Sequence, residues 1–176
     1  MKALVVLFKG VEEIEAVTVI DVLRRADIEV KTAGFASNII EGSHKIRVFV
    51  DMSLEDAVAD DFDALVLPGG SGYKNLINSD EMLKLIKEFD TKNKIIAAIC
   101  ASPAVLGRAG ILEDKKATIY PGMEQAIPRS SSEKLIMDKN VITSQGPGTA
   151  MVFALKLVEA LAGRDKAEKL KKEMIA

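Results

Sequence analysis

The 176-residue chain has no tryptophan, one cysteine, one histidine and five prolines. Because one cysteine cannot form an internal disulfide, we expect the protein to work in a reducing compartment, the cytoplasm. One cysteine and one histidine complete a tetrahedral structural zinc site only if carboxylates join them, and we expect neither a metal nor a cofactor. No apolar run approaches the roughly twenty residues that a membrane-spanning helix requires, so we expect a soluble protein without a membrane partner.

An excess of charge of one sign is also lacking, since 24 Lys and Arg residues face 26 Asp and Glu residues, for a formal net charge of −2. This balance gives no reason to expect binding to nucleic acid or to an anionic membrane. The composition, 48% hydrophobic and 28% charged, is that of a folded globular protein. Because no linker, repeat or low-complexity segment divides the chain, residues 1–176 are expected to form a single domain.

The order of the apolar segments indicates an α/β protein. Continuous apolar runs predict strands that are buried on both faces, and helical patterns follow most of them. The predicted strands are residues 3–8, 28–34, 63–68, 95–99, 117–119 and 141–143, with short strands near 39–40 and 46–50, and the predicted helices begin near Glu12, Asp80, Pro103, Thr149 and Arg164. This alternation predicts a doubly wound, mainly parallel sheet with helices on both faces.

Two details of the helices can be predicted more closely. In the first helix, Ile14, Val17, Ile20 and Leu23 recur at helical spacing, so we expect them to form the stripe that faces the core. Asp80 is expected to cap the helix that follows it, because a short acidic side chain can accept a hydrogen bond from the first turn.

Cys100 stands between the predicted strand 95–99 and the helix that begins at Pro103. A side chain at such a turn is held at the carboxyl edge of the sheet, beside the positive end of the helix and the N–H groups that follow. That field stabilises a thiolate, so we expect a lowered pKa for the Cys100 thiol. A lone cysteine is more often a small buried hydrophobe, but this position makes Cys100 a candidate nucleophile or redox centre.

Glycines follow the predicted strand at 63–68 and reach the same edge of the sheet. The N–H groups of Gly69, Gly70 and Ala101 are candidates for an oxyanion hole, which binds the charge that develops on a carbonyl oxygen. A tight turn with positive φ explains the two glycines equally well. The segment GGSG, residues 69–72, has neither the Walker lysine spacing nor the dinucleotide pattern, which argues against a nucleotide-phosphate loop.

Glu15 shares a helical stripe with Val19 and Val22. Desolvation on that stripe is expected to raise the pKa of the carboxyl, so that it stays protonated and donates a hydrogen bond to a thiolate. The alternative is a third solvent-exposed acid in the first turn, beside Glu12 and Glu13, where the helix dipole favours negative charge.

His44 lies in the polar segment GSHKIR and is expected to be a surface loop residue. A Cys–His dyad with Cys100 is the alternative, because the partners of such a dyad need not be close in sequence.

Several segments of the chain resemble the ThiJ/PfpI superfamily, in particular its small Parkinsonism-associated branch. The resemblance covers nearly the whole chain and rests on ALVVLFKGVEEIEAV, DALVLPGG, IIAAICASPAVL and TSQGPGTAMVFALKLVEAL. It implies a flavodoxin-like sandwich in which Cys100 is the reactive cysteine, Glu15 is its protonated carboxyl partner, and Gly69, Gly70 and Ala101 supply backbone donors.

The resemblance also implies a glutathione-independent glyoxalase or protein deglycase activity on small reactive carbonyls or glycated groups, in stress protection. It further implies a homodimer, with the helix near Ile14 at or near the interface. A non-enzymatic redox sensor or chaperone that uses oxidation of Cys100 is the alternative. An intracellular peptidase is less favoured, because Ala101 stands where the peptidase-like branch has a histidine. Tyr120 stands where some members have a histidine, so general-base help from that position is missing.

Overall fold

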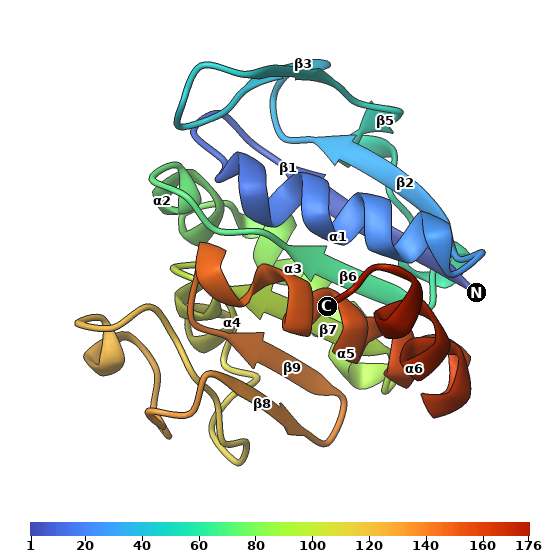
Figure 1. Cartoon of the computed structure of the whole chain (residues 1–176). Helices are drawn as coiled ribbons and strands as arrows, with labels where there is room; N and C mark the ends of the chain where they lie inside the picture. Colours follow the sequence, from blue (N-terminus) through green and yellow to red (C-terminus); the bar gives the residue numbers. More distant parts are fainter.

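The computed structural model describes residues 1–176 and contains one seven-stranded sheet in the order β5-β2-β1-β6-β7-β9-β8 (Figure 1). Neighbouring strands are parallel except β8 and β9, and β3 and β4 form a separate antiparallel hairpin. The strands are β1 (Lys2–Leu7), β2 (Glu29–Gly34), β3 (Ile39–Glu41), β4 (Arg47–Phe49), β5 (Met52–Ser53), β6 (Ala64–Leu67), β7 (Ile95–Ile99), β8 (Leu135–Asp138) and β9 (Val141–Ser144).

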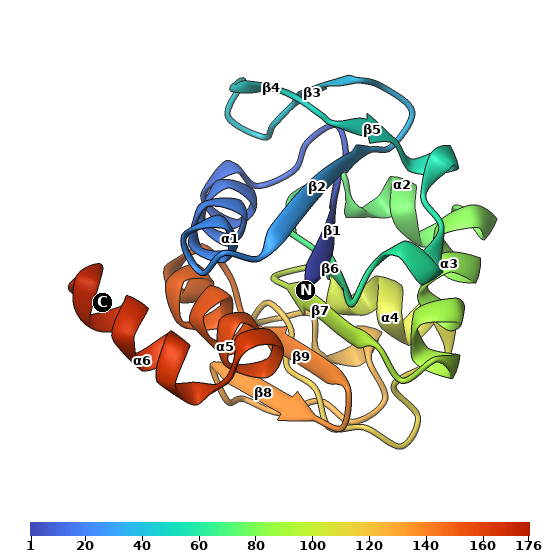
Figure 2. The ribbon, with the colours of Figure 1, turned by 90° about the vertical axis from the view of Figure 1, so that its right-hand side faces the viewer.

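Helices cover both faces of the sheet (Figure 2). On one face α1 packs against α5, which in turn contacts α6, and on the other face lie α2, α3 and α4. The helices are α1 (Glu13–Arg25), α2 (Tyr73–Ile77), α3 (Asp80–Thr91), α4 (Pro103–Ala109), α5 (Ala150–Ala162) and α6 (Arg164–Glu173). Short 3-10 turns occupy Leu54–Asp56, Ala59–Asp61, Glu124–Ala126 and Pro147–Thr149. The predicted fold class is therefore confirmed.

The central strands are apolar along their whole length because both of their faces are covered. All residues of β6 are buried, and β1 and β7 are buried from their second residue onward. Alternation between polar and apolar residues would have marked a sheet with one face in water. None of the helices combines the length and the apolar character needed to cross a bilayer.

The predicted core stripe of α1 is wrong. Ile14 and Val17 are 57% and 50% exposed, Ile20 is half-buried, and only Leu23 of that set lies in the core. The buried face of α1 consists of Glu13, Glu15, Ala16, Val19, Val22 and Leu23. Both sets recur at helical spacing, so the sequence pattern alone does not choose between them; the packing of α1 against α5 does.

Two further details differ from the prediction. Ser79, and not Asp80, is the N-cap of α3: its Oγ accepts a hydrogen bond of 3.2 Å from the N–H of Met82. Residues 117–119 form no strand, and only an isolated bridge joins Ala117 to Ser130. The edge strand next to β9 is instead β8, a four-residue segment. It is a strand because it pairs with β9, and its own sequence pattern does not predict it.

The carboxyl ends of β1, β6 and β7 meet at one edge of the sheet, because the three strands are adjacent and parallel. The turns that follow them are joined directly: the N–H of Glu12 donates to the carbonyl of Gly69 at 2.8 Å. The start of α1, the glycine turn after β6 and the cysteine after β7 are thereby brought to one place.

Candidate active site

Cys100 follows β7 in a left-handed backbone conformation, with φ of 63°. This region is unfavourable for a residue with a Cβ, so the surrounding structure must impose it. Two backbone hydrogen bonds do so: the N–H of Cys100 donates to the carbonyl of Ser144 at 2.9 Å, and its carbonyl accepts from the N–H of Tyr120 at 2.8 Å. The sharp turn directs the partly buried sulfur toward the start of α1.

Glu15, in the first turn of α1, is the carboxyl that meets this sulfur. Its side chain is fully buried, and Oε2 accepts a hydrogen bond of 2.6 Å from the N–H of Gly69. The second oxygen, Oε1, is buried without a conventional donor, and the Cys100 sulfur is the polar group that interacts with this carboxyl. An unpaired buried oxygen is costly, which favours a hydrogen bond between this carboxyl and the thiol of Cys100.

The expected lowering of the Cys100 pKa is wrong. Burial of the sulfur and the negative charge of Glu15 raise the pKa of the thiol to about 12, although the N–H groups of Ala101 and Gly70 act in the opposite direction. The sequence indicated the backbone donors and the helix end correctly. It did not indicate how deeply the sulfur lies, and it expected the Glu15 carboxyl beside the sulfur to be protonated and not negatively charged.

The expected rise in the pKa of Glu15 agrees with its environment. Burial raises the pKa of Glu15 to about 7, against the hydrogen bond from Gly69, which lowers it. Because two anions in contact repel each other, the Cys100–Glu15 pair loses one proton near neutral pH and keeps the second far above it. Near neutral pH, where Glu15 titrates, the pair therefore carries at most one negative charge, on the carboxyl, while the thiol keeps its proton.

Gly69 and Gly70 are both required by the local geometry. A Cβ atom on Gly69 would lie 2.5 Å from the Cβ of Cys100 and 2.8 Å from Oε2 of Glu15. Gly70 has a φ of 114°, and a Cβ atom there would lie 2.3 Å from the carbonyl oxygen of Gly10. The tight-turn interpretation with positive φ is thus correct for Gly70, whereas Gly69 is required by the close approach of Cys100 and Glu15.

The two glycine N–H groups differ in what they contact. The N–H of Gly69 holds Glu15, whereas the N–H groups of Gly70 and Ala101 interact with the sulfur of Cys100. All five residues predicted for the site, Cys100, Glu15, Gly69, Gly70 and Ala101, are brought together. The N–H groups that face a group reacting at the sulfur, however, are those of Gly70 and Ala101.

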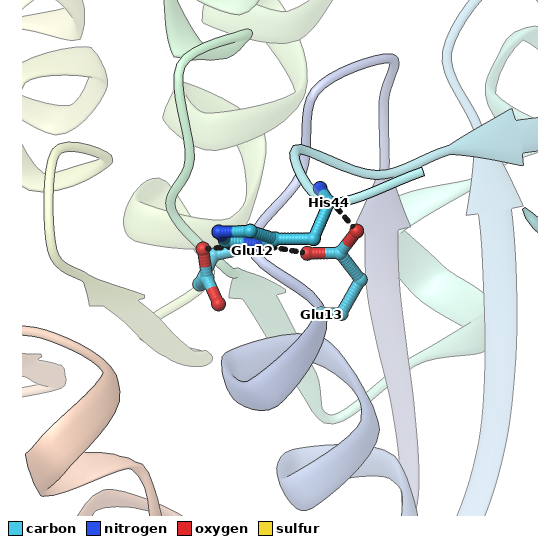
Figure 3. Close-up of side chains that lie close together, drawn as sticks. All are labelled: Glu12, Glu13 and His44. Atoms are coloured by element: carbon cyan, nitrogen blue, oxygen red, sulfur yellow. Dashed lines mark hydrogen bonds and ion pairs between the residues drawn. The ribbon is translucent and has the colours of Figure 1, made fainter. Parts of the chain in front are cut away.

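His44 is a surface loop residue, as expected, and its side chain is 70% exposed. Its ring bonds to Glu13, with Nδ1 at 2.9 Å from Oε2, while its backbone N–H donates to Oε1 of Glu13 at 2.6 Å (Figure 3). Burial alone would raise the pKa of Glu13, but these two bonds outweigh it and hold the pKa below its usual range. The bond from Glu13 and the charge of Glu12 raise the pKa of His44.

Sequence reasoning missed Glu13, which it grouped with the solvent-exposed acids. Its side chain is almost fully buried, because the loop after β3 folds over it and places His44 on both carboxylate oxygens. No local pattern signals this contact, since the two residues lie 31 positions apart.

The sheet is mainly parallel, Cys100 lies on a strained strand-to-helix turn, and a buried carboxyl lies at its side. These features are those of flavodoxin-like α/β proteins with a cysteine at the carboxyl edge of the sheet. Residues 1–160 match the DJ-1/PfpI family model, and the chain belongs to that family. The resemblance inferred from the sequence is confirmed.

The relatives match along nearly the whole chain. The chain is 38% identical to protein dj-1beta of Drosophila melanogaster over 179 residues, covering 98% of this chain and 96% of that protein. It is 39% identical to the Parkinson disease protein 7 homolog of Danio rerio over 182 residues, covering 99% and 96%. Among solved structures, Drosophila melanogaster DJ-1beta superposes with a TM-score of 0.94 at 38% identity, covering 99% of this chain and 97% of that one.

Proposed function

We propose that the protein is a cysteine-dependent enzyme that acts on reactive carbonyls, as a glutathione-independent glyoxalase or a protein deglycase-like hydrolase. One observation carries the proposal: the buried carboxyl of Glu15 interacts with the sulfur of Cys100. Membership of the DJ-1/PfpI family supports it. A nucleophile next to a proton-transfer group is the arrangement that covalent catalysis requires.

In the first step, the sulfur of Cys100 adds to the aldehyde carbon of an α-oxoaldehyde. A sulfur–carbon bond forms, the carbonyl π bond breaks, and the aldehyde oxygen takes the proton of the thiol by way of the Glu15 carboxylate to give a hemithioacetal. The N–H groups of Gly70 and Ala101, which lie beside the sulfur, stabilise the negative charge that develops on this oxygen.

In the second step, the Glu15 carboxylate removes the proton from the former aldehyde carbon and an enediol forms. Return of the proton to the neighbouring carbon gives the thioester of a 2-hydroxy acid. Water then cleaves the thioester, releasing the acid and restoring the Cys100 thiol. One carbon is oxidised and its neighbour is reduced, so the conversion consumes water and needs no external oxidant or reductant.

Turnover of methylglyoxal to lactate by the purified protein, without glutathione, tests this proposal. Cys100→Ser is expected to abolish turnover, and Glu15→Gln to lower it by roughly 10²- to 10⁴-fold, the usual contribution of a general acid–base group. Glu81→Gln, an exposed acid in the first turn of α3, is the matched control and should keep full activity. Turnover that survives in Cys100→Ser would refute the mechanism.

A redox role for Cys100 is the second candidate, and the relative from Toxoplasma gondii, whose solved structure is described as oxidized DJ-1, favours it. That structure superposes with a TM-score of 0.93 at 36% identity, covering 99% of this chain and 97% of that one. In this role, mild peroxide adds about two oxygens to Cys100, giving a sulfinic acid, before the methionines react. Intact-mass and peptide mass spectrometry measure the order, and methionine sulfoxide with reduced Cys100 would count against it.

We also infer that the protein is a homodimer that uses α1. Ile14 and Val17 expose their apolar side chains on this helix, and Ile46 and Phe49 of the adjacent hairpin region are 55% and 78% exposed. The hairpin lies next to the start of α1, because the N–H of Ser43 donates to the carbonyl of Val11. Exposed apolar side chains on neighbouring elements are typical of an interface.

A further inference from the structure

Three side chains that ligate metals in other proteins meet at the start of α1, outside the Cys100 site (Figure 3). Glu12 and Glu13 come from the turn that opens the helix, and His44 comes from the loop between β3 and β4. One oxygen or nitrogen atom from each lies within 4.8 Å of the other two. His44 is the sole histidine of the chain, so its convergence with two carboxylates is not a product of a histidine-rich sequence.

The spacing of these atoms matches the requirements of a small dication. In a tetrahedral zinc site with bonds of about 2.0–2.1 Å, neighbouring ligand atoms are separated by about 3.3 Å. The Nδ1 atom of His44 lies 2.9 Å from Oε2 of Glu13 and 3.6 Å from Oε2 of Glu12. All three separations are at most 4.8 Å, so side-chain adjustments without movement of the backbone can bring the three atoms around one ion.

The ligand atoms are also held in place. Glu13 is 6% exposed, and its Oε1 is fixed by the backbone N–H of His44, which directs Oε2 toward the imidazole ring. The loop can approach so closely because Gly42 has no side chain: a Cβ atom there would lie 2.2 Å from Oε1 of Glu13. Glu12 is the N-cap of α1 but makes no capping hydrogen bond, so its carboxylate remains available.

We propose that Glu12, Glu13 and His44 form a binding site for one divalent cation of the zinc type. Two carboxylates balance the charge of a dication, and a mixed nitrogen and oxygen ligand set favours Zn²⁺ over Ca²⁺ or Mg²⁺, which prefer more oxygen ligands. The exposed side of His44 leaves the remaining coordination position to water. The proposal replaces our expectation that the protein binds no metal, and it does not rest on the function proposed for Cys100.

The test is a calorimetric titration of the Cys100→Ser variant with ZnCl₂ at about pH 8, where imidazole competes well for the metal. This background removes the thiol, the other group that would bind zinc. We expect one equivalent to bind, and we expect the single imidazole Cε1–H signal in the proton NMR spectrum to shift in the same titration. MgCl₂ at the same concentrations should leave that signal unchanged.

Two substitutions in that background assign the site. His44→Asn and Glu12→Gln should each weaken zinc binding by at least about tenfold, since even changes next to a metal ligand cost 10- to 100-fold. Asp21→Asn removes a carboxylate from the same helix, where Asp21 pairs with Arg25, and should leave the affinity unchanged. Glu12 is partly exposed and makes no capping hydrogen bond, so Glu12→Gln should fold normally. Glu12→Gln therefore stays informative if His44→Asn is unstable.

Three results would overturn the proposal. The first is zinc binding in the parent protein that disappears in Cys100→Ser, because the thiol would then be the ligand. The second is binding that Glu12→Gln and His44→Asn leave unchanged. The third is stoichiometric binding without any shift of the imidazole signal.

Discussion

A Cβ atom on Gly69 would lie 2.5 Å from the Cβ atom of Cys100, closer than two such carbons can approach. Gly69→Ala must therefore displace either the cysteine or Glu15, whose Oε2 would lie 2.8 Å from the same atom. We expect a stability loss of about 1–3 kcal/mol, as for other overpacked sites, and slower alkylation of Cys100 by iodoacetamide. Gly148→Ala is the matched control, because no atom lies within 4 Å of its Cβ position. Equal behaviour of the two variants would contradict this account.

The reactivity of Cys100 is expected to depend on Glu15. Burial and the negative charge of Glu15 raise the pKa of the thiol to about 12, so alkylation of Cys100 by iodoacetamide should be slow near neutral pH and accelerate with a midpoint far above pH 7. In Glu15→Gln the neighbouring negative charge is gone while burial still raises the pKa of the thiol, so the midpoint should move to lower pH. Stopped-flow or mass-spectrometric alkylation rates measure both profiles. A parent midpoint that Glu15→Gln leaves in place would mean that the two groups are not coupled.

Glu15 is also expected to make the folded protein less stable as the pH rises. Its pKa is about 7 in the folded protein and near 4.5 when unfolded, so the folded state binds the extra proton between these values. Stability contributed by Glu15 is fully present below about pH 4.5 and is lost as the pH rises through about 7. The total contribution of Glu15 to the free energy of unfolding is about 3 kcal/mol, at about 1.36 kcal/mol per pKa unit.

Urea unfolding across this pH range measures the effect. Glu15→Gln should flatten the decline and be more stable than the parent protein at about pH 8, because it buries no ionisable group. The exposed variant Glu81→Gln should keep the parent slope. Parallel slopes for Glu15→Gln and the parent would show that Glu15 does not titrate as described.

The proposed dimer predicts that charge on the exposed face of α1 separates the subunits. A lysine at Ile14 or Val17 would bury a charge in the interface, whereas in a monomer it would point into water at little cost. Sedimentation velocity at micromolar concentration should show a dimer for the parent protein and a monomer for Val17→Lys. Val152→Lys, at a position on α5 that is 49% exposed, should not change the oligomeric state. A monomeric parent protein would refute the inference.

Much of the fold was predictable because it depends on local patterns. The apolar runs of β1, β6 and β7 and the Pro103 start of α4 are encoded in adjacent residues. The weak strand β8 was not predictable, since its hydrogen bonds come from pairing with β9. The exposed face of α1 was misassigned because Ile14 and Val17 look like core residues unless a partner surface is known.

The residues of the site that follow the ends of neighbouring strands were predictable. The contacts that a loop makes by folding back onto the sheet were not. Cys100 and Gly69 each follow a buried strand, so their proximity follows from the parallel sheet. The pKa of Cys100 depends on burial depth and on Glu15, neither of which a sequence states. The contact between Glu13 and His44 depends on the path of the β3–β4 hairpin, which is not part of the main sheet.

The two edges of the main sheet also limit how copies of this protein can associate. At one edge β5 has two residues, and at the other the four-residue strand β8 turns the pairing antiparallel and ends in Asp138. Short edges offer few free N–H and C=O groups to an incoming strand, and Asp138 adds a charge to the β8 edge. The sheet is therefore poorly suited to growing from one molecule into the next, which protects the protein against amyloid-like stacking at high concentration. Self-association must then use side-chain surfaces such as that of α1, which can saturate in a closed pair instead of propagating.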